Sequence, residues 1–171
     1  MIRSIRFRIT GRRAMATLCL MAASSAACAD DTVDFLVRGA IVPACGLSAS
    51  RVKIDLGTVT AAELTAGHSA WRGASFSGTD CVGVTRASVT VVAPPYGPDG
   101  RYIATTGGAG GVAIELQTAS GQPLPPDGVT EARFHWPSGQ PILAFQARYV
   151  RVATVKPGPA GAMAQVHIRW E

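Results

Sequence analysis

The stretch ILAFQARYVRVATVKPGPAGAMAQVHIRWE, residues 142–171, decides the fold. Its first part, ILAFQARYVRV, reads as one long strand, and a loop rich in proline and glycine (KPGPAG, 156–161) follows it. A regular alternation then continues almost to the C-terminus through Ala162, Ala164, Val166, Ile168 and Trp170. Alternation of this kind is typical of β-strands with one buried face. The stretch therefore predicts two strands joined by a turn.

The same pattern extends toward the N-terminus. Alternating segments are found at residues 32–43, 52–56, 89–93 and 112–116. Turn-forming sequences lie between strands, namely YGPDG (96–100), TTGGAGG (105–111) and ASGQPLPPDG (119–128). Helical periodicity is nearly absent, and one helical turn fits near residues 61–67. Many short strands without a long helix predict an all-β sandwich or barrel in a single domain.

The N-terminus has the features of a secretory signal peptide. Residues 1–13 hold five arginines and no acidic residue, and residues 14–23 form a short uncharged apolar run. Ala27-Cys28-Ala29 follows as a small-x-small cleavage site. The apolar run is too short to span a bilayer as a helix. We therefore expect a signal peptide over residues 1–29 and a mature chain that begins at Asp30.

Removal of this leader changes the charge of the protein. The whole chain has a formal net charge of +5, but the predicted mature chain keeps eleven basic and eleven acidic residues. Its Lys and Arg residues are scattered singly. The sequence therefore offers no electrostatic footprint for nucleic acid.

The cysteines also divide at the leader. Cys19 and Cys28 precede the predicted mature N-terminus, whereas Cys45 and Cys81 remain in an oxidising compartment and are expected to form a disulfide. A loop of this size contributes about 4 kcal/mol of stability on the chain-entropy estimate. The histidines have no ligand spacing with these cysteines, so no metal is expected. As an alternative, Cys28 could become a lipidated N-terminus. Lipoprotein signals usually carry an aliphatic residue three positions before this cysteine, and here that position is Ser25.

Chemistry-bearing motifs are absent from the sequence. The glycine-rich GGAGG (107–111) precedes a strand, whereas phosphate-binding loops need a following helix. No nucleophile elbow and no HExxH occurs. We therefore expect no enzyme, no cofactor and no small-molecule substrate, although a catalytic triad assembled in space leaves no mark in the sequence.

The mature chain resembles the pilins of the chaperone–usher pathway, the type 1 and P pilus family. VDFLVRGAIVPAC (33–45) is similar to the family's opening, and VKIDLGTV (52–59) to its short strand ending in Leu-Gly. GVAIELQTASGQPL (111–124) and LAFQARYV (143–150) resemble later strands, and AMAQVHIRW (162–170) resembles the last one. The family carries a glycine fourteenth from the end, here Gly158, and a penultimate aromatic residue, usually Tyr but here Trp170.

The resemblance implies an incomplete immunoglobulin-like β-sandwich of six main strands, completed by a donor strand from a neighbour. Residues 1–29 would be the signal peptide, residues 30–41 the N-terminal extension and residues 42–171 the pilin domain. The implied donor residues are Val33, Phe35, Val37, Gly39 and Ile41. The implied chaperone and acceptor strand carries Gly158, Ala162, Ala164, Val166, Ile168 and Trp170.

The function implied is that of a structural fimbrial subunit that supports adhesion. Its partners would be a periplasmic chaperone, an outer-membrane usher and neighbouring fimbrial subunits, with export through the periplasm to the cell surface. From the residues alone, 32–42 would be the protein's own edge strand, and the resemblance reverses this interpretation. A secreted monomeric β-sandwich binding module or a lipoprotein is the alternative function. The sequence distinguishes neither a shaft subunit from an adaptor nor the identity of the partners.

Overall fold

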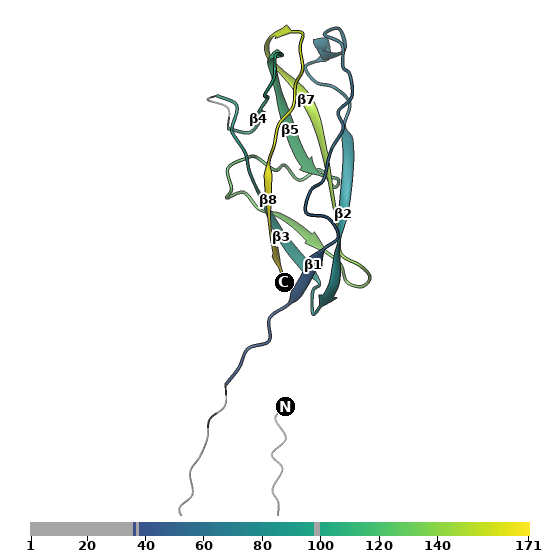
Figure 1. Ribbon diagram of the computed structural model, residues 1–171, viewed down its shortest axis with the longest axis vertical. Helices are drawn as coiled ribbons and strands as arrows, with labels where there is room; N and C mark the ends of the chain where they lie inside the picture. Colours follow the sequence, from purple (N-terminus) through teal and green to yellow (C-terminus); the bar gives the residue numbers. More distant parts are fainter. Residues whose placement is uncertain (1–35, 37, 98–99) are drawn as a thin grey trace, which may run out of the picture. The chain divides into compact units, whose positions relative to one another are not determined.

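Short strands make up most of the regular structure in the computed structural model, which describes Leu36 and residues 38–97 and 100–171. Residues 40–171 form one compact unit (Figure 1). Its strands are β1 (Ala44–Leu47), β2 (Arg72–Val82), β3 (Arg86–Val92), β4 (Ile103–Ala104), β5 (Gly110–Thr118), β6 (Ala132–His135), β7 (Ile142–Lys156) and β8 (Gln165–Trp170). A single turn of 3-10 helix, η1 (Glu63–Ala66), is the only helix in the described ranges. No helix of that part is long and apolar enough to cross a membrane.

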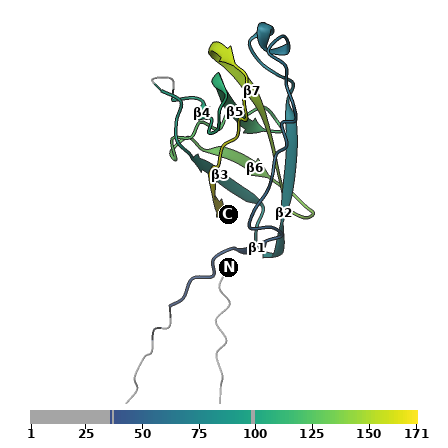
Figure 2. The ribbon, with the colours of Figure 1, turned by 45° about the horizontal axis from the view of Figure 1, so that its top comes forward.

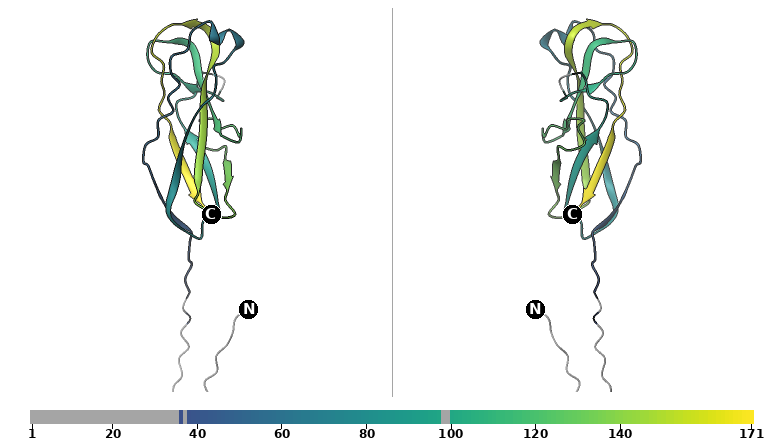
Figure 3. Two further views of the ribbon diagram at one scale, coloured as in Figure 1. Left: turned by 90° about the vertical axis from the view of Figure 1, so that its right-hand side faces the viewer. Right: turned by 90° about the vertical axis from the view of Figure 1, so that its left-hand side faces the viewer.

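The strands form two antiparallel sheets. The larger has the order β1-β2-β7-β5-β4, and the smaller has the order β6-β3-β8. Figures 2 and 3 show the small sheet, with β8 in yellow, facing the long strands β2 and β7 across the core. The predicted all-β sandwich is confirmed. The described residues contain eight strands, of which β1, β4 and β6 have four residues or fewer and show no strong alternation in the sequence.

The core divides into two clusters of buried side chains. The first, here called the closed cluster, lies between the small sheet and the larger one and contains Val89, Val91, Leu124, Ala132, Leu143 and Phe145. The second, the open cluster, contains Ala93, Ile103, Ile114 and Ala147. Half-buried Ile54 and Leu116 pack against both clusters.

Three predicted strand segments differ from the structure in whole or in part. Residues 52–56 alternate as expected, with Ile54 and Leu56 half-buried between exposed neighbours, but they belong to no strand. Their backbone is extended without a ladder because no described strand of this chain lies beside them to bond it. Residues 162–164 likewise precede β8 without joining it. Of the segment 32–43, the described residues 36 and 38–43 lie in no strand, and the rest lies outside the described residues.

The predicted turn at residues 105–111 runs into the start of β5, whose first residue is Gly110. Gly111 has a φ of +73°, and an added Cβ would meet the carbonyl oxygen of Thr154 at 2.1 Å. The register of β5 against β7 shifts at this point, so Gly111 forms a β-bulge that only glycine fits. The glycine-rich segment predicted as a loop before a strand thus has a packing role, since it lets β5 approach the far end of β7.

Candidate functional site: an open groove beside the last strand

The last strand, β8, has a partner on one side only. It pairs with β3, so that Val166 lies opposite Val91, Ile168 opposite Val89 and Trp170 opposite Ala87. It is the outermost strand of the small sheet, and no described strand bonds to its other edge. An unpaired strand edge presents a row of backbone donors and acceptors that can template another strand.

The hydrogen bonds at the C-terminus show which backbone groups face the free edge. The Arg86 and Glu171 backbones exchange two bonds, each N···O distance being 2.9 Å. Bonding and non-bonding pairs alternate in an antiparallel ladder, so the next bonded positions on β8 are Arg169 and His167. The N–H and C=O groups of Val166, Ile168 and Trp170 therefore point away from β3, toward the open edge.

A groove of about 430 Å³ runs along this open edge. One wall is the extended segment 52–57, and the other is residues 160–166, including Ala162, Ala164 and Val166. The floor comes from β4, β5 and β7 and is mostly apolar, with Ile103, Ile114, Leu116, Phe145, Ala147 and Tyr149. The groove therefore lies directly beside the open cluster, at a place where no described strand covers it.

The wall formed by residues 52–57 keeps its shape through local bonds. The Asp55 carboxylate accepts a hydrogen bond from the Gly57 N–H at 3.0 Å, and Gly57 takes a φ of +67°. This hydrogen bond, and next the charge of Lys53 at 3.5 Å, lower the pKa of Asp55 below its ordinary value. Ile54 and Leu56 turn inward and Lys53 and Asp55 outward, so the wall is apolar toward the groove and charged on its rim.

The upper end of the groove is held by close backbone contacts. The Tyr149 hydroxyl donates a hydrogen bond to the Ala160 carbonyl at 2.8 Å, and burial, followed by the nearby Asp55 charge, raises the pKa of Tyr149. A Cβ on Gly158 would lie 2.5 Å from the carbonyl carbon of Gly108. Glycine at position 158 therefore lets the loop that leads into the groove wall touch the glycine-rich segment.

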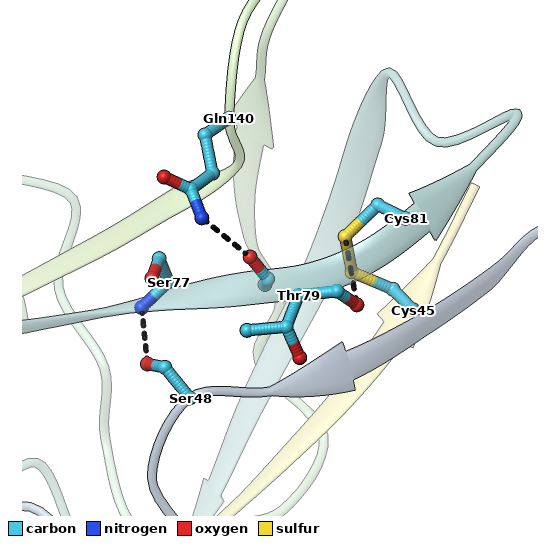
Figure 4. Close-up of a disulfide and its surroundings, with 7 residues drawn as sticks. Cys45, Ser48, Ser77, Thr79, Cys81 and Gln140 are labelled. Carbon is cyan, nitrogen blue, oxygen red and sulfur yellow. Dashed lines mark hydrogen bonds between the residues drawn. A yellow bond between two sulfur atoms is a disulfide. The ribbon is translucent and has the colours of Figure 1, made fainter.

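The start of the other wall is anchored by the Cys45–Cys81 disulfide, which confirms the predicted bridge and joins β1 to β2. The Ser77 N–H donates to the Ser48 hydroxyl at 3.0 Å beside it (Figure 4). A Cβ on Gly78 would meet both sulfur atoms, at 2.4 and 2.6 Å, so glycine is needed beneath the bridge. The bridge fixes where the chain enters the segment that becomes the groove wall.

Below the groove, Trp170 belongs to an aromatic cluster. Its ring lies 6.2 Å from that of Trp136, and Trp136 in turn stacks on Phe134 at 5.9 Å. The Trp136 indole N–H donates to the Ile142 carbonyl at 3.2 Å. The penultimate aromatic residue thus packs against a second tryptophan, Trp136.

The structure brings most of the sequence-predicted acceptor residues to one place. Ala162, Ala164 and Val166 line the groove, Ile168 and Trp170 pack on the closed cluster, and Gly158 lies just above. Of the predicted donor residues, Gly39 and Ile41 are exposed, whereas Val33, Phe35 and Val37 lie outside the described residues. The sequence did not indicate the floor residues or Tyr149, because their strands are distant along the chain and nothing local marks them as groove-lining.

The described strands form an immunoglobulin-like sandwich in which one edge of β8 has no strand beside it. Residues 35–171 match the model of the fimbrial protein family, so the chain belongs to that family. It is a structural subunit of a pilus, a cell-surface fibre, and the family is one of structural pilins. Subunits of such fibres interact with other fimbrial subunits. No curated protein matches the chain in sequence.

Solved structures show the same fold. The P pilus rod subunit PapA matches with a TM-score of 0.63 and 21% identity, over 74% of this chain and 99% of that one. A chain in a chaperone–usher pilus structure matches with a TM-score of 0.63 and 20% identity, over 83% and 97%. The CupB6 tip adhesin from Pseudomonas aeruginosa matches with a TM-score of 0.63 and 20% identity, over 72% of this chain but 38% of the adhesin. At these identities the likeness concerns the fold.

Proposed function

We propose that the groove receives the N-terminal extension of a neighbouring subunit as an added β-strand. The observation that carries this proposal is the apolar groove beside the unpaired edge of β8, between two walls that no described strand joins. β-strand addition uses such an edge: main-chain bonds supply affinity, and alternate side chains fill the pockets. The inserted strand would bond to the backbone groups of Val166, Ile168 and Trp170.

The extension has the composition that this groove requires. Val33, Phe35, Val37 and Ile41 fall on one side of an extended chain, and Gly39 allows close backbone approach on the same side. Burial of a large apolar side chain stabilises by about 1.5–3 kcal/mol, so four give roughly 6–12 kcal/mol before ordering costs. Among described residues of this segment, Ile41 is fully exposed and Leu36 is 76% exposed.

The open groove also supports a requirement for partners before assembly. An apolar groove beside a free strand edge promotes aggregation, so a periplasmic chaperone would cover it until an outer-membrane usher brings the next subunit. Export would begin with removal of residues 1–29, leaving an extension at residues 30–41 and a pilin domain at residues 42–171. Both partners would contact β8, so truncation after Gly161 is expected to abolish chaperone capture.

A peptide of residues 30–42 tests the insertion directly. It is expected to raise the melting temperature of the mature chain, because a ligand that binds only the folded state stabilises it by mass action, by about 2.7 kcal/mol at 100 times its Kd. A Phe35→Asp peptide should lose this effect, since it would bury a charge.

The matched control is a Leu36→Asp peptide, which carries the same charge one residue away on the opposite face. It is expected to stabilise nearly as well as the unmodified peptide. Equal stabilisation by the Phe35→Asp and Leu36→Asp peptides, or none by the unmodified peptide, would contradict strand insertion.

A further inference from the structure

The rims of the groove carry charges on both sides. On the rim formed by residues 51–55, Arg51, Lys53 and Asp55 are exposed to solvent. The Lys53 ammonium lies 3.5 Å from the Asp55 carboxylate. On β8, the residues between the groove-facing ones are Gln165, His167 and Arg169, all exposed. Arg169 makes a loose pair with Glu131 at 3.8 Å. Any strand inserted between the rims would have its outward side chains between these two rows.

The two walls run in opposite directions. Residues 52–57 line the groove together with residues 160–166, whereas residues 57–61 line the next pocket together with residues 155–160. In Figure 1 the first wall leaves β1 and ascends toward η1, and β8 descends to the C-terminus beside β1. Arg51 and Arg169 therefore belong to the same end of the groove, and Asp55 lies farther toward the other end.

The extension of this chain carries the complementary pattern. Asp34 and Arg38 are four residues apart and alternate with the apolar donor residues, so they fall on the opposite face of an extended strand. On the rim, Arg51 and Asp55 are also four residues apart, with the signs in the reverse order. Four residues span about 13 Å in any extended strand, so both charges can be matched at once.

We propose that the rim charges pair with the extension of a second copy of this chain, so that in a strand inserted antiparallel to β8 Asp34 lies beside Arg51 and Arg169 and Arg38 lies beside Asp55. This inference rests on the strand insertion proposed above. The opposite direction would place Asp34 near Asp55 and Arg38 near the two arginines, where like charges repel. The rim charges thus favour the extension of a second copy in this direction, and the apolar face supplies most of the affinity.

The extension of the same copy is a poor occupant. Only Val42 and Pro43 separate Ile41 from β1, which is fixed to β2 by backbone pairing and by the disulfide. A strand antiparallel to β8 must run parallel to the segment 52–57, in the same direction as the chain that leaves β1. Intramolecular insertion would require the chain to reverse within these two residues and then return, so a second molecule is the better donor. Self-complementarity of this kind suits a subunit that repeats along a fibre.

Four versions of the mature chain, residues 30–171, test the charge pattern. They are the unmodified chain, an exchanged donor (Asp34→Arg with Arg38→Asp), an exchanged rim (Arg51→Asp with Asp55→Arg), and the combination of all four substitutions. Each exchange leaves net charge and apolar residues unchanged. Self-assembly is followed by sedimentation velocity at low and at high salt.

Either exchange alone is expected to slow assembly roughly tenfold at low salt, since each exposed pair changes from attraction to repulsion. The combination should recover to within about threefold of the unmodified chain, with Arg169 left unmatched. High salt should remove most of the differences. Because Asp55 also accepts the Gly57 hydrogen bond, the pair Arg51→Asp with Asp34→Arg repeats the rescue without altering Asp55.

The outcomes separate this inference from strand insertion itself. If the unmodified chain assembles and the exchanges have no effect, or the combination gives no rescue, the charge pairing is overturned while insertion stands. If the unmodified chain does not assemble but captures the extension peptide of a different subunit, the second-copy partner is overturned. If it neither assembles nor binds its own 30–42 peptide, strand insertion fails as well.

Discussion

The closed and open core clusters show how one sandwich contains both a finished and an unfinished interior. Over the closed cluster, β3, β6 and residues 124–128 cover the larger sheet, and Val89, Val91 and Leu143 are fully buried. Over the open cluster the cover stops at the gap between residues 52–57 and β8, and the floor of the groove remains accessible. Both clusters consist of apolar side chains, and the open cluster differs in having no described strand over the gap beside β8.

This comparison separates folding from assembly. The closed cluster is covered by strands of the subunit's own chain, while the open cluster lies beside the groove in which we propose that a strand from outside inserts. A substitution in the closed cluster should therefore change stability in every state of the protein. A substitution at the groove should matter most once the groove is filled.

The largest expected effect comes from truncation of Leu143. Leu143→Ala should lower the free energy of unfolding by about 2–5 kcal/mol, equally with and without the 30–42 peptide, because the cavity forms in the closed cluster. Leu56→Ala removes the same atoms from the half-buried groove wall. It should cost only about 1 kcal/mol in the free chain but weaken peptide binding. Denaturant unfolding with and without the 30–42 peptide measures the free energy of unfolding of each variant. If the peptide stabilises the two variants equally, the division of the core into a closed and an open cluster is contradicted.

A smaller loss of stability is expected from a substitution at Gly158, in the loop that leads into the groove wall of residues 160–166. Gly158→Ala places a methyl group against the Gly108 backbone, so the two loops must separate, and overpacking of this kind typically costs about 1–3 kcal/mol. Gly161→Ala in the same loop is the control, because an added Cβ has no atom within 4 Å. Thermal unfolding of the free chain should show a lower melting temperature for Gly158→Ala alone. Similar losses in both variants would mean that the close approach at Gly158 is not the cause.

The smallest effect concerns the loop that covers the closed side. The Asp127 carboxylate accepts bonds from the Thr130 hydroxyl at 2.6 Å and from the Thr130 and Val129 amides at 2.8 Å, and the Thr130 bonds most strongly lower the pKa of Asp127. A lowered folded-state pKa means that the stabilisation is present above the ordinary carboxyl pKa and is lost as the pH falls through the lowered value.

Asp127→Asn should therefore cost under about 1 kcal/mol at neutral pH and nothing in acid, where the carboxylate is protonated in both states. Denaturant unfolding of the unmodified chain and of Asp127→Asn, each at neutral and at acid pH, gives the loss of stability at each pH. A loss that is the same in acid would assign the effect to side-chain geometry instead of charge.

The sequence by itself determined the strands whose pattern is strong. The alternation of 86–92, the long strand from Ile142, the turn near η1 and the Cys45–Cys81 bridge all follow from local residue choice and from oxidising conditions. The sequence also indicated the alternating face that becomes β8 and a family in which such a face accepts a strand. Short strands such as β4 and β6 escaped prediction because four or fewer residues carry too little periodicity.

Only the tertiary structure decided where the interior is left open. Residues 52–56 have the pattern of a strand, yet whether they form a ladder depends on a neighbour that no local pattern specifies. The pairing of Trp136 with Trp170 and the contact of Gly158 with Gly108 also join residues far apart in the chain. Alternation fixes which side of a strand is apolar, because side chains point to opposite faces in turn. Which strand lies alongside, or whether any does, is fixed by the long-range packing of the two sheets.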